Sequence, residues 1–78
     1  MISQQQVIKR LKELQQYRFV SYHNEIAKGQ HLVKLRVMAF IEVPQLMHRA
    51  DIFFVVTERE GYLSARSLDY SLQIDRLS

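Results

Sequence analysis

Residues Leu32 to Pro44 read as one long β-strand, and this stretch constrains the fold more than any other. Every odd-numbered position from Val33 to Val43 is apolar. A period of two is typical of a strand because successive side chains point to opposite faces. Most of these residues are β-branched, which favours the same structure. Pro44 has no N–H to donate to a sheet, so we expect the strand to end there.

The even-numbered positions of the same stretch change character along the strand. They include the basic residues Lys34 and Arg36 near the start and the apolar residues Met38 and Phe40 further on, and the full set is Leu32, Lys34, Arg36, Met38, Phe40 and Glu42. One face of the strand is therefore expected to be buried throughout, and the other to be polar at one end and apolar at the other. This asymmetry predicts a face that the protein's own core does not use.

The length and composition indicate a single small domain over residues 1–78. The absence of cysteine excludes disulfides and thiolate metal sites, and it fits a reducing cytoplasm. No apolar run approaches the roughly 18 residues that span a bilayer, and the N-terminus lacks a signal-peptide layout, so we expect a cytoplasmic protein with no membrane contact. The net charge of +3 permits an acidic partner such as nucleic acid without requiring one.

The N-terminal sequence predicts a helix over residues 1–16. Ser3 is a suitable N-cap, and Gln6 three residues later completes a capping box. Ile2 and Val7 are placed to form a hydrophobic staple around this cap. Apolar residues at helical spacing then form one stripe that would pack on a sheet. The stripe consists of Val7, Ile8, Leu11 and Leu14.

The segment from Tyr17 to Ile26 predicts a strand that forms a hairpin with the first. Gly29 supplies the positive φ that a two-residue loop at Lys28-Gly29 requires. In a regular ladder through this loop, Ile26 pairs with His31 and Tyr22 pairs with Leu35. This register sends every second residue of the new strand to the face that the core does not use.

That second face would carry two groups of side chains. Near one end of the hairpin, the apolar and aromatic residues of both strands adjoin. Near the other end, a histidine and two cations adjoin, while Arg18 falls on the core side. The predicted partner interface consists of Tyr17, Phe19, Met38 and Phe40, and the alternative nucleic-acid face consists of His23, Lys34 and Arg36.

The second half of the chain predicts two further strands. Residues 44–51 read as a connection with one or two helical turns, because proline suits the first turn of a helix. Ile52 to Thr57 is apolar on both faces and so predicts a central strand. After a turn at residues 58–61, residues 62–75 predict the return strand.

The alternation of this return strand changes phase between Ala65 and Leu68, which predicts a bulge or kink there. A C-terminal helix through Leu68, Leu72 and Leu77 is the weaker alternative. The element order is helix, strand, strand, connection, strand, strand. We therefore predict an α+β domain in which an N-terminal helix packs on one four-stranded antiparallel sheet.

No catalytic or cofactor motif stands out. Two isolated glycines cannot form a phosphate-binding loop, and no serine lies in a G-x-S-x-G turn. His23 and Glu25 share a strand face but lack a third ligand, so we expect no metal site. His23 with Lys34 and Arg36 would suit a metal-free ribonuclease, which needs an acid or base plus cations. Solvated polar residues at the end of a hairpin explain the same pattern more simply.

These observations predict a small non-enzymatic accessory or regulatory protein that acts through protein–protein contact, as a homodimer or on another protein. The reason is that one helix cannot cover both faces of a sheet, and large exposed apolar patches mark contacts. Binding of single-stranded RNA by the basic and aromatic face is the alternative, and a ribonuclease is third. The affinity for nucleic acid would fall steeply with salt, whereas an apolar interface would not weaken.

Overall fold

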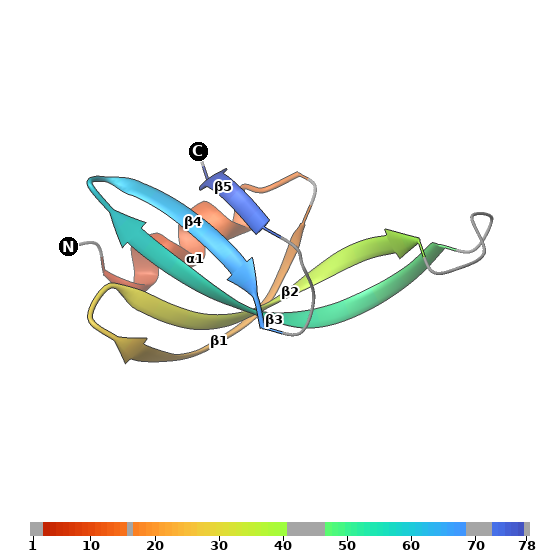
Figure 1. Cartoon of the computed structure of the whole chain (residues 1–78), viewed down its shortest axis with the longest axis horizontal. Helices are drawn as coiled ribbons and strands as arrows, with labels where there is room; N and C mark the ends of the chain where they lie inside the picture. The colour runs from red at the N-terminus through yellow and green to blue at the C-terminus, as the bar shows by residue number, and fades with distance from the viewer. Residues whose placement is uncertain (1–2, 16, 41–46, 69–72, 78) are drawn as a thin grey trace.

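The computed structural model describes residues 3–15, 17–40, 47–68 and 73–77, and the side chains of all of these except 38–40, 47–49 and 75–77. Within these ranges the chain forms one helix and five strands (Figure 1). The elements are α1 (Gln4–Lys12), β1 (Arg18–Ala27), β2 (Gln30–Phe40), β3 (Met47–Arg59), β4 (Tyr62–Ser67) and β5 (Gln73–Leu77).

The sheet is an antiparallel meander in which each strand pairs with the next one along the chain. Its order is β1-β2-β3-β4-β5, so β3 is the central strand, as its apolar sequence predicts. The predicted α+β class, with an N-terminal helix and an antiparallel sheet, is confirmed. The sheet has five strands where the sequence predicts four.

The additional strand arises because the predicted return strand at residues 62–75 is two strands. β4 ends at Ser67, where the change of phase predicted a kink, and β5 begins at Gln73. The backbone N–H of Leu68 still donates to the carbonyl of Phe53 at 3.1 Å, which closes the β3–β4 ladder. The alternative of a C-terminal helix is wrong because β5 occupies this part of the chain.

The predicted connection at residues 44–51 is also revised. Met47 to Asp51 belong to β3 and pair with β2, from Phe40↔Met47 to Arg36↔Asp51. Residues 44–46 lie outside the described part of the chain. An extended conformation is favoured here because β2 offers a continuous ladder to this segment, and such tertiary pairing overrides a weak local helix signal.

The helix begins as its sequence predicts. The Ser3 hydroxyl accepts from the Gln6 N–H at 3.2 Å, and the Gln6 side chain accepts from the Ser3 N–H at 3.0 Å, so the capping box is confirmed. The helix ends at Lys12, earlier than predicted, and Ile2 of the proposed staple lies outside the described residues. Val7 and Leu11 of the predicted apolar stripe are fully buried, Leu14 packs against the core beyond the helix end, and Ile8 is only half-buried.

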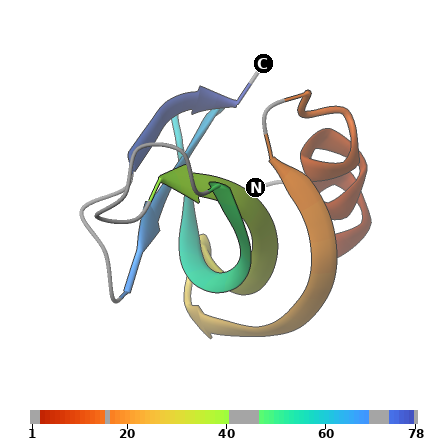
Figure 2. The same cartoon turned by 90° about the vertical axis from the view of Figure 1, so that its right-hand side faces the viewer.

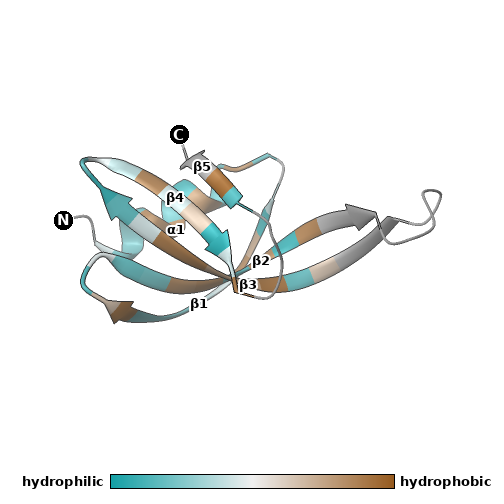
Figure 3. Ribbon diagram, viewed as in Figure 1, coloured by the Kyte–Doolittle hydropathy of each residue, from teal (hydrophilic) through white to brown (hydrophobic). Residues whose placement is uncertain are grey.

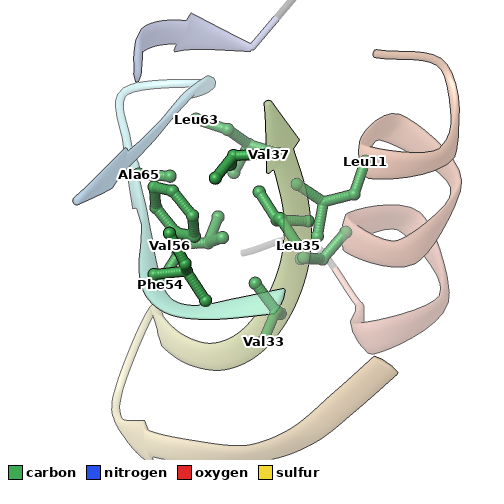
Figure 4. Packing of buried hydrophobic residues seen from close by; sticks show 10 residues of the cluster. Leu11, Val33, Leu35, Val37, Phe54, Val56, Leu63 and Ala65 are labelled. Atoms are coloured by element: carbon green, nitrogen blue, oxygen red, sulfur yellow. The ribbon is translucent and has the colours of Figure 1, made fainter. Parts of the chain in front are cut away.

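The hydrophobic core lies between α1 and the concave side of the sheet (Figures 2 and 4). Alternate residues are buried in it from Val33 to Val37 in β2 and from Ile52 to Val56 in β3, and Phe54 is its largest fully buried side chain. Apolar residues are concentrated where β2 and β3 cross the middle of the molecule (Figure 3). The core consists of Val7, Leu11, Val33, Leu35, Val37, Ile52, Phe54, Val56, Leu63 and Ala65.

The register between β1 and β2 is not the regular one predicted. Ala27 pairs with Gln30 across the Lys28-Gly29 loop, and Gly29 has the expected positive φ of 76°. The register then shifts three times along β1, so that Glu25, and not Ile26, pairs with His31. Each shift adds a residue to β1 and increases the local twist. This lets β1 bend around the core.

Beyond the body of the sheet, β2 and β3 continue as a two-stranded ribbon, which we call the arm (Figure 1). The arm consists of Met38–Phe40 and Met47–Arg49, which pair only with each other among the described residues. It makes the molecule elongated, at 42 × 22 × 20 Å. The ladder between β2 and β3 is unbroken from the body into the arm.

Candidate functional site

The face of the sheet opposite the core, which we call the outer face, brings together two of the three predicted nucleic-acid residues. Lys34 pairs across the ladder with Phe53, and its Nζ lies 4.4 Å from the centre of the Phe53 ring. The His23 ring lies 5.0 Å from the same ring, and its Nε2 is 2.9 Å from the Ser21 hydroxyl. Phe53 is therefore occupied by protein groups, which leaves less of its ring for a base to stack on.

The third residue, Arg36, is paired with an acidic group. Its Nε and a second guanidinium nitrogen donate to the two carboxylate oxygens of Asp51 at 2.8 and 3.3 Å. This hydrogen bond raises the pKa of Arg36 and lowers the pKa of Asp51, which Lys34 also lowers slightly. A phosphate at Arg36 would have to compete with this carboxylate. Arg36 is therefore not a free cation on the outer face.

The predicted partner interface is not one continuous face. Tyr17 packs edge-on against the buried Phe54, with ring centres 6.1 Å apart, and Phe19 is half-buried against the core. The bulges in β1 cause this, since each extra residue moves the following side chains to the other face. Met38 and Phe40 lie in the arm, on the β2 positions that alternate with the buried ones. The structure thus separates the aromatic residues of β1 from the apolar positions of β2.

Arg18 is displaced by the same shifts. It is exposed and pairs with Arg36, on the face opposite to the predicted one. The prediction that placed Arg18 on the core side is wrong, because it assumed a ladder without bulges.

The histidines do not form a metal site in the part of the chain that the structure describes. No group of three His, Cys, Asp or Glu residues there could hold a metal ion. His31 is buried on the core side, opposite to His23, as the sequence predicts. Its Nδ1 lies 2.7 Å from the Tyr22 hydroxyl, and its buried Nε2 has no hydrogen-bond partner among the described residues. Burial is the main cause that raises the pKa of Tyr22, followed by the charge of Glu25.

Part of β3 has a strand neighbour on one side only among the described residues. β4 pairs with β3 only from Phe54 onward, and no described strand pairs with Met47 to Ile52 on the side away from β2. We call this stretch the free edge of β3. An unpaired strand edge presents a row of N–H and C=O groups on which another chain can form a ladder.

Two hydrogen bonds determine which residues point toward the free edge. The Glu58 N–H donates to the Gly29 carbonyl at 2.9 Å, so even-numbered residues of β3 bond toward β2. The Phe53 carbonyl accepts from Leu68, so odd-numbered residues bond toward the β4 side. Because the β3 register against β2 is continuous, the backbone groups of Arg49 and Asp51 point to the free edge.

Sequence reasoning missed Asp51, Phe53 and the free edge. Phe53 was visible as part of a strand that is apolar on both faces. The pairing of Asp51 with Arg36 was not visible, because it depends on the β2–β3 register, and the length of the segment between these strands was unknown. No described helix is long and apolar enough to cross a membrane. Comparisons with protein-family models, curated proteins and solved structures give no match for this chain.

Proposed function

We propose that this chain is a small non-enzymatic accessory protein that acts through protein–protein contact, and that the arm with the adjoining free edge of β3 is its contact element. The observation that supports this most is the free edge itself, which continues past the arm to Ile52 with no neighbouring strand among the described residues. Strand edges of this kind bind other chains by adding a strand to the sheet. We expect a cytoplasmic location, on the composition alone.

The make-up of the arm supports the same function. An isolated two-stranded ribbon is only marginally stable in water. The sequence from Val37 to Ile41 is entirely apolar, and β3 begins with the apolar residue Met47. A partner strand would provide the additional hydrogen bonds and apolar contacts that such a ribbon lacks. The predicted interface residues Met38 and Phe40 belong to this contact element, whereas Tyr17 and Phe19 do not.

RNA binding on the outer face remains the second candidate. The placement of Lys34 beside the Phe53 ring favours it, since a cation near an aromatic ring is typical of single-strand binding sites. The Arg36–Asp51 ion pair argues against it, because the carboxylate would repel phosphate. A ribonuclease would use the same residues and meets the same objection.

The arm can be removed without cutting the body of the sheet. Val37 and Ala50 face each other across the ladder, and Ala50 bonds toward β2. A two-residue Asn-Gly turn joins such a pair directly. The variant in which Asn-Gly replaces residues 38–49 therefore keeps the whole core, including Val37 and Ile52. Circular dichroism and thermal unfolding would establish that it folds.

The test is a pull-down from native lysate with tagged wild-type and arm-shortened protein, with and without nuclease. We expect the wild type to capture the same proteins under both conditions, and the shortened variant to lose them. Lys34→Ala, on the outer face, is the matched control and should retain them. Capture that persists without the arm, or that nuclease or moderate salt abolishes, would contradict the proposal and favour the outer face.

A further inference from the structure

We infer that the partner at the free edge of β3 is a second copy of this chain, which pairs antiparallel with the first about a two-fold axis at Ala50. This inference rests on the proposed function, since it identifies the occupant of the same contact element. The result would be a continuous sheet in which the two β3 strands are neighbours. Such self-complementary contacts are the commonest basis of protein dimers.

The backbone fits this arrangement. In an antiparallel ladder, opposite residues that bond to each other exchange both N–H···O=C bonds. Arg49 and Asp51 both direct their backbone groups to the free edge. With the axis at Ala50, position 49 of each chain lies opposite position 51 of the other, so each of these pairs can exchange both bonds. The two Ala50 residues then form the central pair that does not bond, where strands approach most closely.

The charges select this register over its neighbours. The axis at Ala50 places a positive and a negative residue opposite each other twice, Arg49 against Asp51 and Asp51 against Arg49. A shift that preserves the faces must move the strands by two residues. It would place Asp51 opposite Asp51, or Arg49 opposite Arg49. Opposite charges across a ladder stabilise it, and like charges directly opposite destabilise it.

Asp51 is placed to accept this second cation. It already accepts two hydrogen bonds from Arg36 of its own chain, and its side chain remains 37% exposed. A carboxylate has further acceptor positions. In the dimer each Asp51 would lie between Arg36 of its own chain and position 49 of the other.

The edge of β1 and the part of β2 that extends beyond β1 are less suited to this pairing. The exposed edge of β1 is interrupted by three register shifts, and bulges of this kind are one way in which proteins protect an edge. The described part of β2 without a β1 partner, Val37 to Phe40, is shorter than the free edge of β3 and carries no charge that would fix a register. The second copy is therefore assigned to β3.

Two single variants test both the dimer and its register. Arg49→Asp gives a chain with two acidic residues on the free edge, and Asp51→Arg gives a chain with two basic ones. Each homodimer would have like charges opposite each other at both pairs, so we expect its dissociation constant to rise by roughly tenfold. An equimolar mixture has opposite charges at both pairs and should form a heterodimer with an affinity close to that of the wild type.

The measurement is sedimentation velocity of the purified proteins at low salt, with native mass spectrometry to identify the heterodimer. Circular dichroism of each variant shows whether it is folded. A wild-type dimer, weaker single variants and a restored heterodimer support the inference. Arg49→Pro, which removes one N–H from the free edge but none from the β2 ladder, should also give a monomer.

The results that would overturn this inference differ from those that would overturn the proposed function. A wild-type protein that stays monomeric, while the arm is still required to capture another protein, overturns the dimer and leaves the contact element in place. If the wild type is a dimer but the mixture of Arg49→Asp and Asp51→Arg forms no heterodimer of similar affinity, the proposed register is overturned. A dimer that the arm-shortened variant forms equally well overturns the assignment to the free edge.

Discussion

The arm and the body of this protein are built from the same two strands, yet different interactions hold them together. In the body, β2 has β1 as its second neighbour, β3 has β4, and alternate residues of both strands are buried in the core. In the arm, the two strands pair only with each other among the described residues. The ladder register is the same in both regions.

The ladder of hydrogen bonds alone therefore does not determine how stable a pair of strands is. Burying one large apolar side chain contributes roughly 1.5–3 kcal/mol, whereas a backbone hydrogen bond contributes about 1 kcal/mol because water competes for it. The body combines both kinds of interaction. The stability of the arm depends on its hydrogen-bond ladder and on contacts with a binding partner. We therefore expect the body to fold without the arm, and the arm to need the body.

The largest loss of stability should come from a substitution at the centre of the core. Phe54→Ala removes the largest fully buried side chain and its edge contact with Tyr17, and it should lower the free energy of unfolding by roughly 3–5 kcal/mol. Urea unfolding followed by circular dichroism measures this loss. The arm-shortened protein should lose a similar amount on the same substitution, because the core is complete without the arm.

Phe53→Ala is the matched control for this prediction. Phe53 is the next residue before Phe54 and lies on the outer face. It is half-buried there, and its ring contacts His23 and Lys34. We expect a loss of about 1 kcal/mol. Equal losses at the two positions would show that the outer face is covered as fully as the core and would remove the distinction between them.

The next effect concerns α1, which covers the body and does not extend over the arm (Figure 1). Ser3→Ala removes the hydroxyl that accepts from the Gln6 N–H and should lower the free energy of unfolding by roughly 0.5–2 kcal/mol. Gln5→Ala, at an exposed position outside the cap, should have almost no effect. Hydrogen exchange should show faster opening in the body and an unchanged rate in the arm.

A smaller effect, of opposite sign, is expected at the turn between β3 and β4. Glu60 and Gly61 form the two-residue loop between these strands. Both have positive φ, at 54° and 82°, as a type I′ hairpin turn requires. Glutamate is disfavoured there and asparagine is tolerated, so Glu60→Asn should raise the free energy of unfolding by up to about 1 kcal/mol. Gly61→Ala should lower it, although the added methyl group would meet no atom within 4 Å. Thermal unfolding of both variants measures these changes.

The smallest effect should arise at the base of the arm and depend on pH. Arg36 lowers the pKa of Asp51 in the folded state, so this carboxylate stabilises the fold at neutral pH. Its contribution is lost as the pH falls through that lowered pKa, below the ordinary range of an aspartate. The melting temperature of Asp51→Asn should therefore fall less on acidification than that of the wild type. Parallel curves would show that the ion pair contributes nothing to folding, as is common for exposed pairs.

Much of the fold follows from local patterns in the sequence. The capping box at Ser3, the alternation along β2 and the glycine of the first hairpin each depend on neighbouring residues, and the structure confirms all three. The burial of Val7 and Leu11 follows from helical spacing in the same way. These features were predictable because the interactions that decide them lie within a few residues.

The remaining features of the fold depend on pairing between residues that are far apart in the chain. Such pairing cannot be predicted from the local patterns of one sequence. The bulges in β1 carry no glycine or proline to mark them, yet they move Phe19 and Tyr17 to the core side. The alternation from Leu68 to Ile74 continues across the boundary between β4 and β5, so two strands looked like one. The candidate site was missed for the same reason, since an edge exists only once all neighbours are known.

The unbroken ladder between β2 and β3 restricts how this protein can change in length. Because side chains alternate with a period of two, a single inserted residue in either strand would exchange the faces of everything beyond it. The arm can therefore grow or shrink only by matched steps in both strands, or at its tip. β1 shows the opposite behaviour, since it accommodates three extra residues one at a time. Among relatives of this chain, we expect variation in length to collect in β1 and at the tip of the arm, while the spacing from Gln30 to Phe40 stays fixed.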